Sequence, residues 1–277
     1  MNGVSIITNL YLNIYLTQIE NTQALVCVAE GTLDEMQYSK APIIEAAIDI
    51  STSPSIHGNN ENLQKLRETV KQEYPDSQPI FEQKFIFQQD QQYTSSHHTV
   101  NPTGLRLINV EQHKVANVRL DGCGLSILHP YDNWEIFRNE AKKLWNLYRN
   151  VLEPKNATRL GVRFINRMDI PGVTIKLEDY LRTLPQISSD MPQSLQRYFM
   201  QLTVPMIDIS AIAVINQAIV PPPEDGMTSI MLDIDLSRIE NLPEDEESIW
   251  SIFEELRIGK NNIFEACITS KYKELIT

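Results

Sequence analysis

The stretch Arg159-Leu-Gly-Val-Arg-Phe-Ile-Asn-Arg-Met-Asp-Ile-Pro171 predicts the strand around which the rest of the chain is organised. Its even positions are apolar apart from Asn166, whereas its odd positions include Arg159, Arg163 and Arg167. Successive side chains of a strand point to opposite faces. The pattern therefore predicts one face against a hydrophobic core and a second face that carries three guanidinium groups.

Three guanidinium groups on one face repel one another, so carboxylates, a bound anion or solvent must lie opposite them. One interpretation is a ligand site in which Arg159, Arg163 and Arg167, together with Asn166, bind a phosphate, a nucleotide or a nucleic-acid backbone. Guanidinium forks match such oxyanions in geometry. The second interpretation needs no ligand and depends on an earlier strand.

That earlier strand is predicted at residues 42–50, where Glu45 and Asp49 lie on the polar face of an alternating apolar segment. If the two strands are neighbours, Glu45 and Asp49 face Arg163 and Arg167 in a structural ion-pair ladder. The sequence favours this ladder over the ligand site. An alanine at Arg163 separates the two interpretations, because it destabilises a ladder but only removes binding from a ligand site.

An internal duplication would make the two strands neighbours. Ile48-Asp49-Ile50 matches Met168-Asp169-Ile170, and Trp134-Glu-Ile-Phe137 matches Trp250-Ser-Ile-Phe253 at a similar separation. In each half, a strand with an aspartate near its end leads to a long helix that begins with Trp-x-Ile-Phe. Short identities also arise by chance, so the duplication is a hypothesis. Under it, the two leading strands lie side by side at the centre of the molecule.

The expected fold class is α+β, with two similar halves, residues 37–155 and 156–277, that pack as one unit. Each half is expected to be an antiparallel or mixed sheet with helices on one face. Residues 1–36 form an extension, which is either an added arm or the result of a start codon upstream of Met36. The polar stretch 88–102 predicts a mobile loop, and apolar residues at helical spacing, Leu195, Tyr198, Phe199 and Leu202 among them, predict one or two short helices over 176–202.

Composition is that of a globular protein, with 277 residues of which 42% are hydrophobic. A net charge of −12 and a pI near 4.9 argue against non-specific binding to nucleic acid or anionic lipid. The charge is polarised, because residues 224–277 hold 13 Asp or Glu against 5 Lys or Arg. Three widely spaced cysteines, no signal peptide and no apolar run long enough for a membrane span predict a cytoplasmic location.

The common enzyme motifs are absent from the sequence: there is no phosphate-binding loop, nucleophile elbow or zinc-binding helix. Asp233 and Asp235, with Asp208, are candidate metal ligands, because alternate residues of a strand share a face. Such a pattern more often indicates carboxylates exposed on a strand. Trp134, Trp145 and Trp250 lie in apolar helical stripes and are expected in the core. No catalytic residue, metal ligand or cofactor is predicted.

Several segments together resemble a sporadically distributed prokaryotic family of uncharacterised proteins, over about residues 37–277. The most specific segment is Arg159–Pro171, which matches the motif R-L-G-x-R-[FY]-I-N-R. The other segments are Ala41–Ile50, His129–Glu135, Leu144–Tyr148 and Phe264–Thr269. The resemblance implies no activity and no site residue. The patchy distribution of the family implies accessory gene neighbourhoods, such as phage defence or toxin-antitoxin loci.

The sequence therefore predicts a non-catalytic cytoplasmic interaction or accessory protein that acts through a protein-binding surface, as a homodimer or with a protein partner. The alternative is an enzyme or sensor that binds a nucleotide or nucleic acid through Arg159, Arg163 and Arg167. Polarised charge and the lack of a catalytic constellation favour the first interpretation.

Overall fold

The computed structural model describes residues 38–277 except 55–57, 90–93, 112 and 194, and it does not describe the side chains of 82–101. Residues 37–277 form one compact unit. The expected extension, residues 1–36, lies outside the described residues.

Nine strands form one antiparallel sheet in the order β2-β3-β4-β5-β1-β6-β9-β8-β7. The α+β class is as predicted, but both halves of the sequence contribute to a single sheet and not to one sheet each. The strands are β1 Ile43–Thr52, β2 Asp76–Gln89, β3 Thr94–Ile108, β4 Lys114–Arg119, β5 Gly122–Leu128, β6 Ala157–Pro171, β7 Phe199–Met206, β8 Ala211–Val220 and β9 Met227–Arg238.

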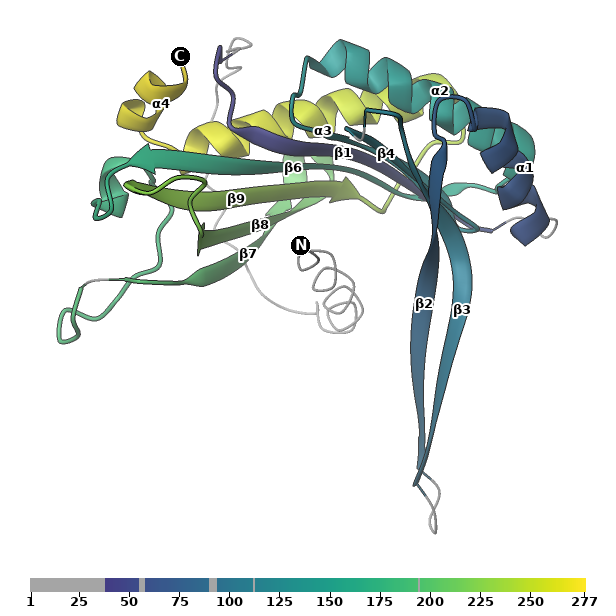
Figure 1. Cartoon of the computed structure of the whole chain (residues 1–277), viewed down its shortest axis with the longest axis horizontal. Helices are drawn as coiled ribbons and strands as arrows, with labels where there is room; N and C mark the ends of the chain where they lie inside the picture. Colours follow the sequence, from purple (N-terminus) through teal and green to yellow (C-terminus); the bar gives the residue numbers. More distant parts are fainter. Residues whose placement is uncertain (1–37, 55–57, 90–93, 112, 194) are drawn as a thin grey trace. The chain divides into compact units, whose positions relative to one another are not determined.

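The helices are α1 Asn60–Val70, α2 Trp134–Leu152, α3 Glu246–Cys267 and α4 Ser270–Ile276, with short 3-10 turns η1 Leu177–Asp179 and η2 Ile207–Ile209. The two long helices, α2 and α3, lie along the same face of the sheet (Figure 1). Among the described residues, none of the helices combines the length and the apolar character needed to cross a membrane.

The two leading strands, β1 and β6, are neighbours at the centre of the sheet, as the sequence predicted. They run antiparallel, with Ile48 opposite Val162 and Ala46 opposite Phe164. These four side chains are almost fully buried beneath the helices. The apolar side chains at the even positions of β6 therefore point to the helices. Their removal from water stabilises this arrangement.

The helical layer follows from capping and from an apolar stripe. The side chain of Asn133 caps α2, because it accepts a hydrogen bond from the backbone N–H of Ile136 at 2.9 Å. Glu153 ends the helix in the left-handed conformation with φ of 47°. Of the three predicted core tryptophans, Trp145 and Trp250 are 3% and 4% exposed, whereas Trp134 is only partly buried at the edge of the core.

Helix α3 runs without a break through Gly259, although a glycine inside a helix is destabilising. A Cβ atom at this position would lie 2.8 Å from Cδ2 of Leu236 on β9. The glycine therefore allows a close approach between helix and sheet.

Two local predictions were wrong. Most of the expected loop 88–102 is part of the β2–β3 hairpin, whose outer portion pairs with no further strand among the described residues (Figure 1). Residues 199–202, expected in a helix, belong to edge strand β7. In both segments, pairing with a neighbouring strand overrides the local sequence preference.

Candidate functional site

The arginine row lies on the face of the sheet opposite α2 and α3, which we call the arginine face. Strand β6 has β1 on one side and β9 on the other, in unbroken register around Arg163, which lies between Ala47 and Asp235. The ion pairs of this face join side chains from four strands, β4, β1, β6 and β9. All of its principal charges are partly buried, with side-chain exposures of 3–38%.

The first charged chain crosses all four of these strands. Asp49 on β1 accepts hydrogen bonds from Arg119 on β4 at 2.9 and 3.2 Å. Its Oδ1 also lies 3.6 Å from Nη1 of Arg159. Arg159 in turn donates to Asp235 on β9 at 2.8 Å. One aspartate is thus held by two guanidinium groups from opposite sides.

Two glycines make room for this chain. Asp49 faces Gly124 on β5 and Gly161 on β6. A Cβ at Gly124 would lie 2.7 Å from Oδ2 of Asp49, and a Cβ at Gly161 would lie 2.6 Å from Nη1 of Arg159. The guanidinium of Arg159 therefore lies over the backbone of its own strand, in the space that a side chain at 161 would fill.

The second group centres on Arg163, which donates two hydrogen bonds of 2.8 Å to Asp233 on β9. The side chain of Asp233 is only 3% exposed. It also accepts a hydrogen bond from Asn216 at 3.1 Å, and Asn216 accepts one from Gln201 at 2.8 Å. The hydrogen bonds and charge of Asp233 raise the pKa of Arg163 above its usual value.

Arg167 lies at the end of the row and is the most exposed of the three, at 38%. It donates to Asp169 at 3.0 Å, and Asp169 also accepts a hydrogen bond from the hydroxyl of Ser229. Each of the four arginines Arg119, Arg159, Arg163 and Arg167 therefore has an aspartate within ion-pair distance. An anionic ligand would have to compete with these carboxylates.

The predicted ladder has different partners from those expected. Arg163 pairs with Asp233 and Arg167 with Asp169, whereas Asp49 pairs with Arg119 and Arg159. The register between β1 and β6 explains this pairing. Asp49 lies opposite Gly161, and the guanidinium of Arg159 lies over the backbone at Gly161.

Glu45 has no ion pair among the described residues, although its charge contributes to the raised pKa of Arg163. Asp233 was expected to be an exposed strand carboxylate and is instead almost fully buried.

Asn166 does not belong with the arginines as a ligand-binding residue. It is 3% exposed and points toward the helices, on the opposite face of β6. Its side-chain amide donates to the backbone carbonyl of Leu232 at 3.1 Å. This satisfies the requirement that a buried amide find a partner.

Lys260 is a buried polar residue that sequence reasoning missed. It lies on α3, is 8% exposed, and its Nζ is 3.7 Å from the centroid of the Phe164 ring on β6. Among the described residues its ammonium has no hydrogen bond or ion pair. Burial, and to a smaller extent the charge of Arg257, lowers the pKa of Lys260 to about 7. The aromatic face offsets part of the cost of the buried cation.

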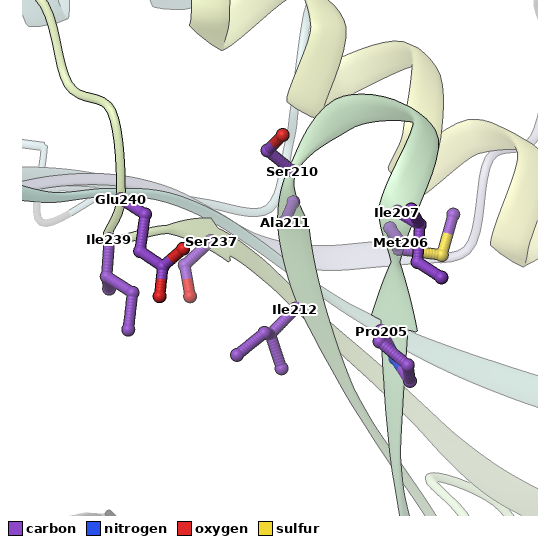
Figure 2. Close-up of a pocket in the computed structure, with 9 residues that line it drawn as sticks. All are labelled: Pro205, Met206, Ile207, Ser210, Ala211, Ile212, Ser237, Ile239 and Glu240. Atoms are coloured by element: carbon purple, nitrogen blue, oxygen red, sulfur yellow. The ribbon is translucent and has the colours of Figure 1, made fainter. Parts of the chain in front are cut away.

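A small pocket of about 250 Å³ lies near the end of β7 (Figure 2). Pro205, Ile212 and Ser237 come from adjacent strands β7, β8 and β9 and form one row across the sheet. The polar side chains that line the pocket do not form a recognisable catalytic pair. The complete lining is Pro205, Met206, Ile207, Ser210, Ala211, Ile212, Ser237, Ile239 and Glu240.

The three aspartates that are candidate metal ligands in the sequence do not come together in the structure. Asp233 and Asp235 instead face arginines, and Asp208 lies on η2 at the far end of β7. Burial raises the pKa of Asp235, and Arg159 and Arg163 oppose this shift. In the part of the chain that the structure describes, no group of three His, Cys, Asp or Glu side chains is arranged to hold a metal ion.

No protein-family model matches the chain, and a search of curated proteins finds no match either. The contacts, burial and charge of the side chains are therefore the basis for a proposed function.

Replacing Arg163 tests whether the arginine row is structural. We expect Arg163→Ala to lower the free energy of unfolding by about 2–4 kcal/mol, because it leaves the carboxylate of Asp233 buried without its counter-ion. Arg167→Ala, at the exposed end of the row, should cost less than about 1 kcal/mol. Urea unfolding measures both values. Adding Asp233→Asn to Arg163→Ala should recover part of the loss, and equal losses for the two single variants would contradict the structural role.

Lys260 should make stability depend on pH. Its folded-state pKa lies below its unfolded value, so the unfolded chain binds more protons and stability falls as the pH is lowered through the folded pKa. We expect the free energy of unfolding of the wild type, relative to Lys260→Met, to rise by about 1 kcal/mol from pH 7 to pH 8. The surface variant Lys143→Met should follow the wild type. Parallel curves for wild type and Lys260→Met would show that Lys260 is not buried as an amine.

Proposed function

We propose that the chain is a non-catalytic cytoplasmic interaction protein that acts by binding another protein chain through its surface. The observation that carries this proposal is the pairing of Arg119, Arg159, Arg163 and Arg167 with aspartates of the same sheet. The residues that looked most suited to ligand chemistry are thereby used to stabilise the fold. Some of the residues that remain exposed are apolar, and exposed apolar surface favours protein contacts.

Four of the exposed large apolar residues lie near the β7 edge of the sheet. Phe199 is 67% exposed, Val204 36%, Ile207 66% and Ile239 44%. Phe199 and Val204 lie on β7, Ile207 follows it on η2, and Ile239 follows β9. Ile207 and Ile239 also line the small pocket. Single exposed apolar residues are normal on protein surfaces, but several beside an edge strand and a pocket are typical of a contact surface.

Two further observations support the location and setting. Cys123 and Cys267 are buried and free, which agrees with a reducing compartment. The resemblance of Arg159–Pro171 to the sporadically distributed prokaryotic family agrees with an accessory role beside another gene product.

The proposal includes an origin by internal duplication, which would explain the order of the strands. In each half the leading strand pairs with the last strand of the following meander, β1 with β5 and β6 with β9. A long helix then follows and begins with Trp-x-Ile-Phe, and both phenylalanines, Phe137 and Phe253, are 0% exposed. The halves also differ, because α1 and β2 belong only to the first.

Superposition of residues 43–152 on 157–267 tests the duplication. We expect the best superposition to align β1 with β6, β5 with β9 and α2 with α3, and to bring Asp49 close to Asp169. A best superposition that pairs the elements in another order would argue for chance similarity of the short motifs.

The interaction role predicts a defined outcome for the purified full chain. We expect it to self-associate or to retain a protein partner, as measured by light scattering after size exclusion and by pull-down. Thermal-shift assays with ATP, GTP and a short oligonucleotide should give no stabilisation. Stabilisation by a nucleotide that disappears in Arg163→Ala would favour the alternative, a nucleotide sensor. A chain that stays monomeric and retrieves no partner would contradict the interaction role.

A further inference from the structure

Strand β7 is an edge strand with the properties of a contact surface. It ends the sheet, and among the described residues it pairs only with β8. Natural edge strands usually carry charges, most often lysine, to block pairing with another chain. None of the eight residues Phe199–Met206 is charged, and Pro205, whose missing N–H hinders pairing, lies only near one end of the strand. The edge is therefore poorly protected against pairing.

The charge of the chain makes this edge a favourable place for two copies to meet. A net charge of −12 makes two copies repel each other. An uncharged strand minimises that repulsion. The nearest charges on either side of the strand have opposite signs, Arg197 before it and Asp208 after it. Both are exposed, and neither has an ion pair among the described residues.

The two ends of β7 are complementary in shape as well as in charge. Phe199 and Pro205 point to the same face, because they are separated by an even number of positions on a regular strand. At one end Phe199 is 67% exposed. At the other end Pro205 begins the row with Ile212 and Ser237 that lines the pocket (Figure 2). An exposed aromatic ring and an apolar hollow thus occupy opposite ends of one strand.

Antiparallel pairing of two copies brings these ends together. A two-fold axis perpendicular to the sheet requires that paired residues point to the same face. With Leu202 on the axis, Phe199 lies opposite Pro205 of the second copy. The ring then extends the row Pro205, Ile212 and Ser237 of that copy and covers the rim of its pocket. Symmetry makes the same contact twice. Arg197 lies one residue from the position opposite Asp208 of the second copy.

We infer that β7 is the interface of a symmetric homodimer, in which β7 pairs antiparallel with β7 of a second copy and each Phe199 packs against the other copy's pocket. The inference rests on the proposed role as an interaction protein and names the partner as the chain itself. The pairing joins two sheets at their uncharged edges, and main-chain hydrogen bonds supply much of the contact, as in other cases of strand addition.

Sedimentation of the full chain across a range of concentrations tests the dimer. We expect a dimer for the wild type and a dissociation constant raised roughly 100-fold by Phe199→Asp, because two buried rings are lost and two charges are added. The matched control is Val110→Asp in the turn between β3 and β4, since Val110 is also 67% exposed. It should remain dimeric. A wild type that is monomeric throughout, or a Phe199→Asp variant as dimeric as the control, overturns the inference.

Cysteine cross-linking tests the register. In the proposed pairing Gln201 lies opposite Thr203 of the second copy, at a separation that a disulfide can span. Oxidation of a mixture of Gln201→Cys and Thr203→Cys chains should give a linked dimer. Each variant alone, and the wild type, should give little, because like positions are too far apart. Both replaced residues are exposed, so neither change disturbs the core, although Gln201→Cys removes the hydrogen bond to Asn216. A dimer that does not cross-link in the mixture overturns this arrangement.

Charge reversal provides an independent readout. Arg197→Asp should weaken the dimer and Arg197→Asp with Asp208→Arg should restore it, because the pair then has reversed but matching signs. The outcome also separates this inference from the proposed function. A monomeric wild type that binds another protein, and loses it on Phe199→Asp, overturns the homodimer and leaves the interaction role intact. A monomer with no partner contradicts both.

Discussion

The antiparallel pairing of β6 with β9, together with the ion pair between Arg163 and Asp233 that crosses it, is the constraint on which the rest of the structure depends. Strand β6 has to satisfy two incompatible sets of side chains. Its apolar side chains must be removed from water, whereas its arginines must keep contact with water or with a carboxylate. The sheet solves this by covering one face with α2 and α3 and by supplying aspartates from both neighbouring strands on the other. A charge as buried as Asp233 is tolerated only with a guanidinium and a further hydrogen bond in place.

The sequence predicts the faces of β6 but not the partners on them, and the reason is physical. Alternation with a period of two is a local property, so a single strand reveals which side chains share a face. Which aspartate meets which arginine depends on the register between strands far apart in the sequence, and one position of slip reverses every side chain. Asp49 was therefore identified as part of a ladder but assigned to the wrong arginines. Asp233 was noticed, and its burial was not foreseen.

Two other features were not predicted correctly, and each has its own cause. The first is the edge strand β7, where the local sequence pattern is weak. Leu195, Tyr198, Phe199 and Leu202 recur at helical spacing, yet Phe199 and Leu202 lie on strand β7. An edge strand buries little on either face, so its alternation is faint and pairing with β8 decides its conformation. Lys260 was missed because a lysine on an amphipathic helix is normally solvated, and only the position of Phe164 on β6 shows that this one is not.

The polar groups of the arginine face also connect the centre of the sheet with its edge. Arg163 donates to Asp233, Asn216 donates to the same carboxylate, and Gln201 on β7 donates to Asn216. These bonds cross four strands in sequence, from β6 through β9 and β8 to β7. A strand held in this way has already lost much of its conformational freedom, so pairing with a further strand costs less ordering entropy than it would for a loose edge. The interaction that stabilises the core thereby also prepares the edge for a partner.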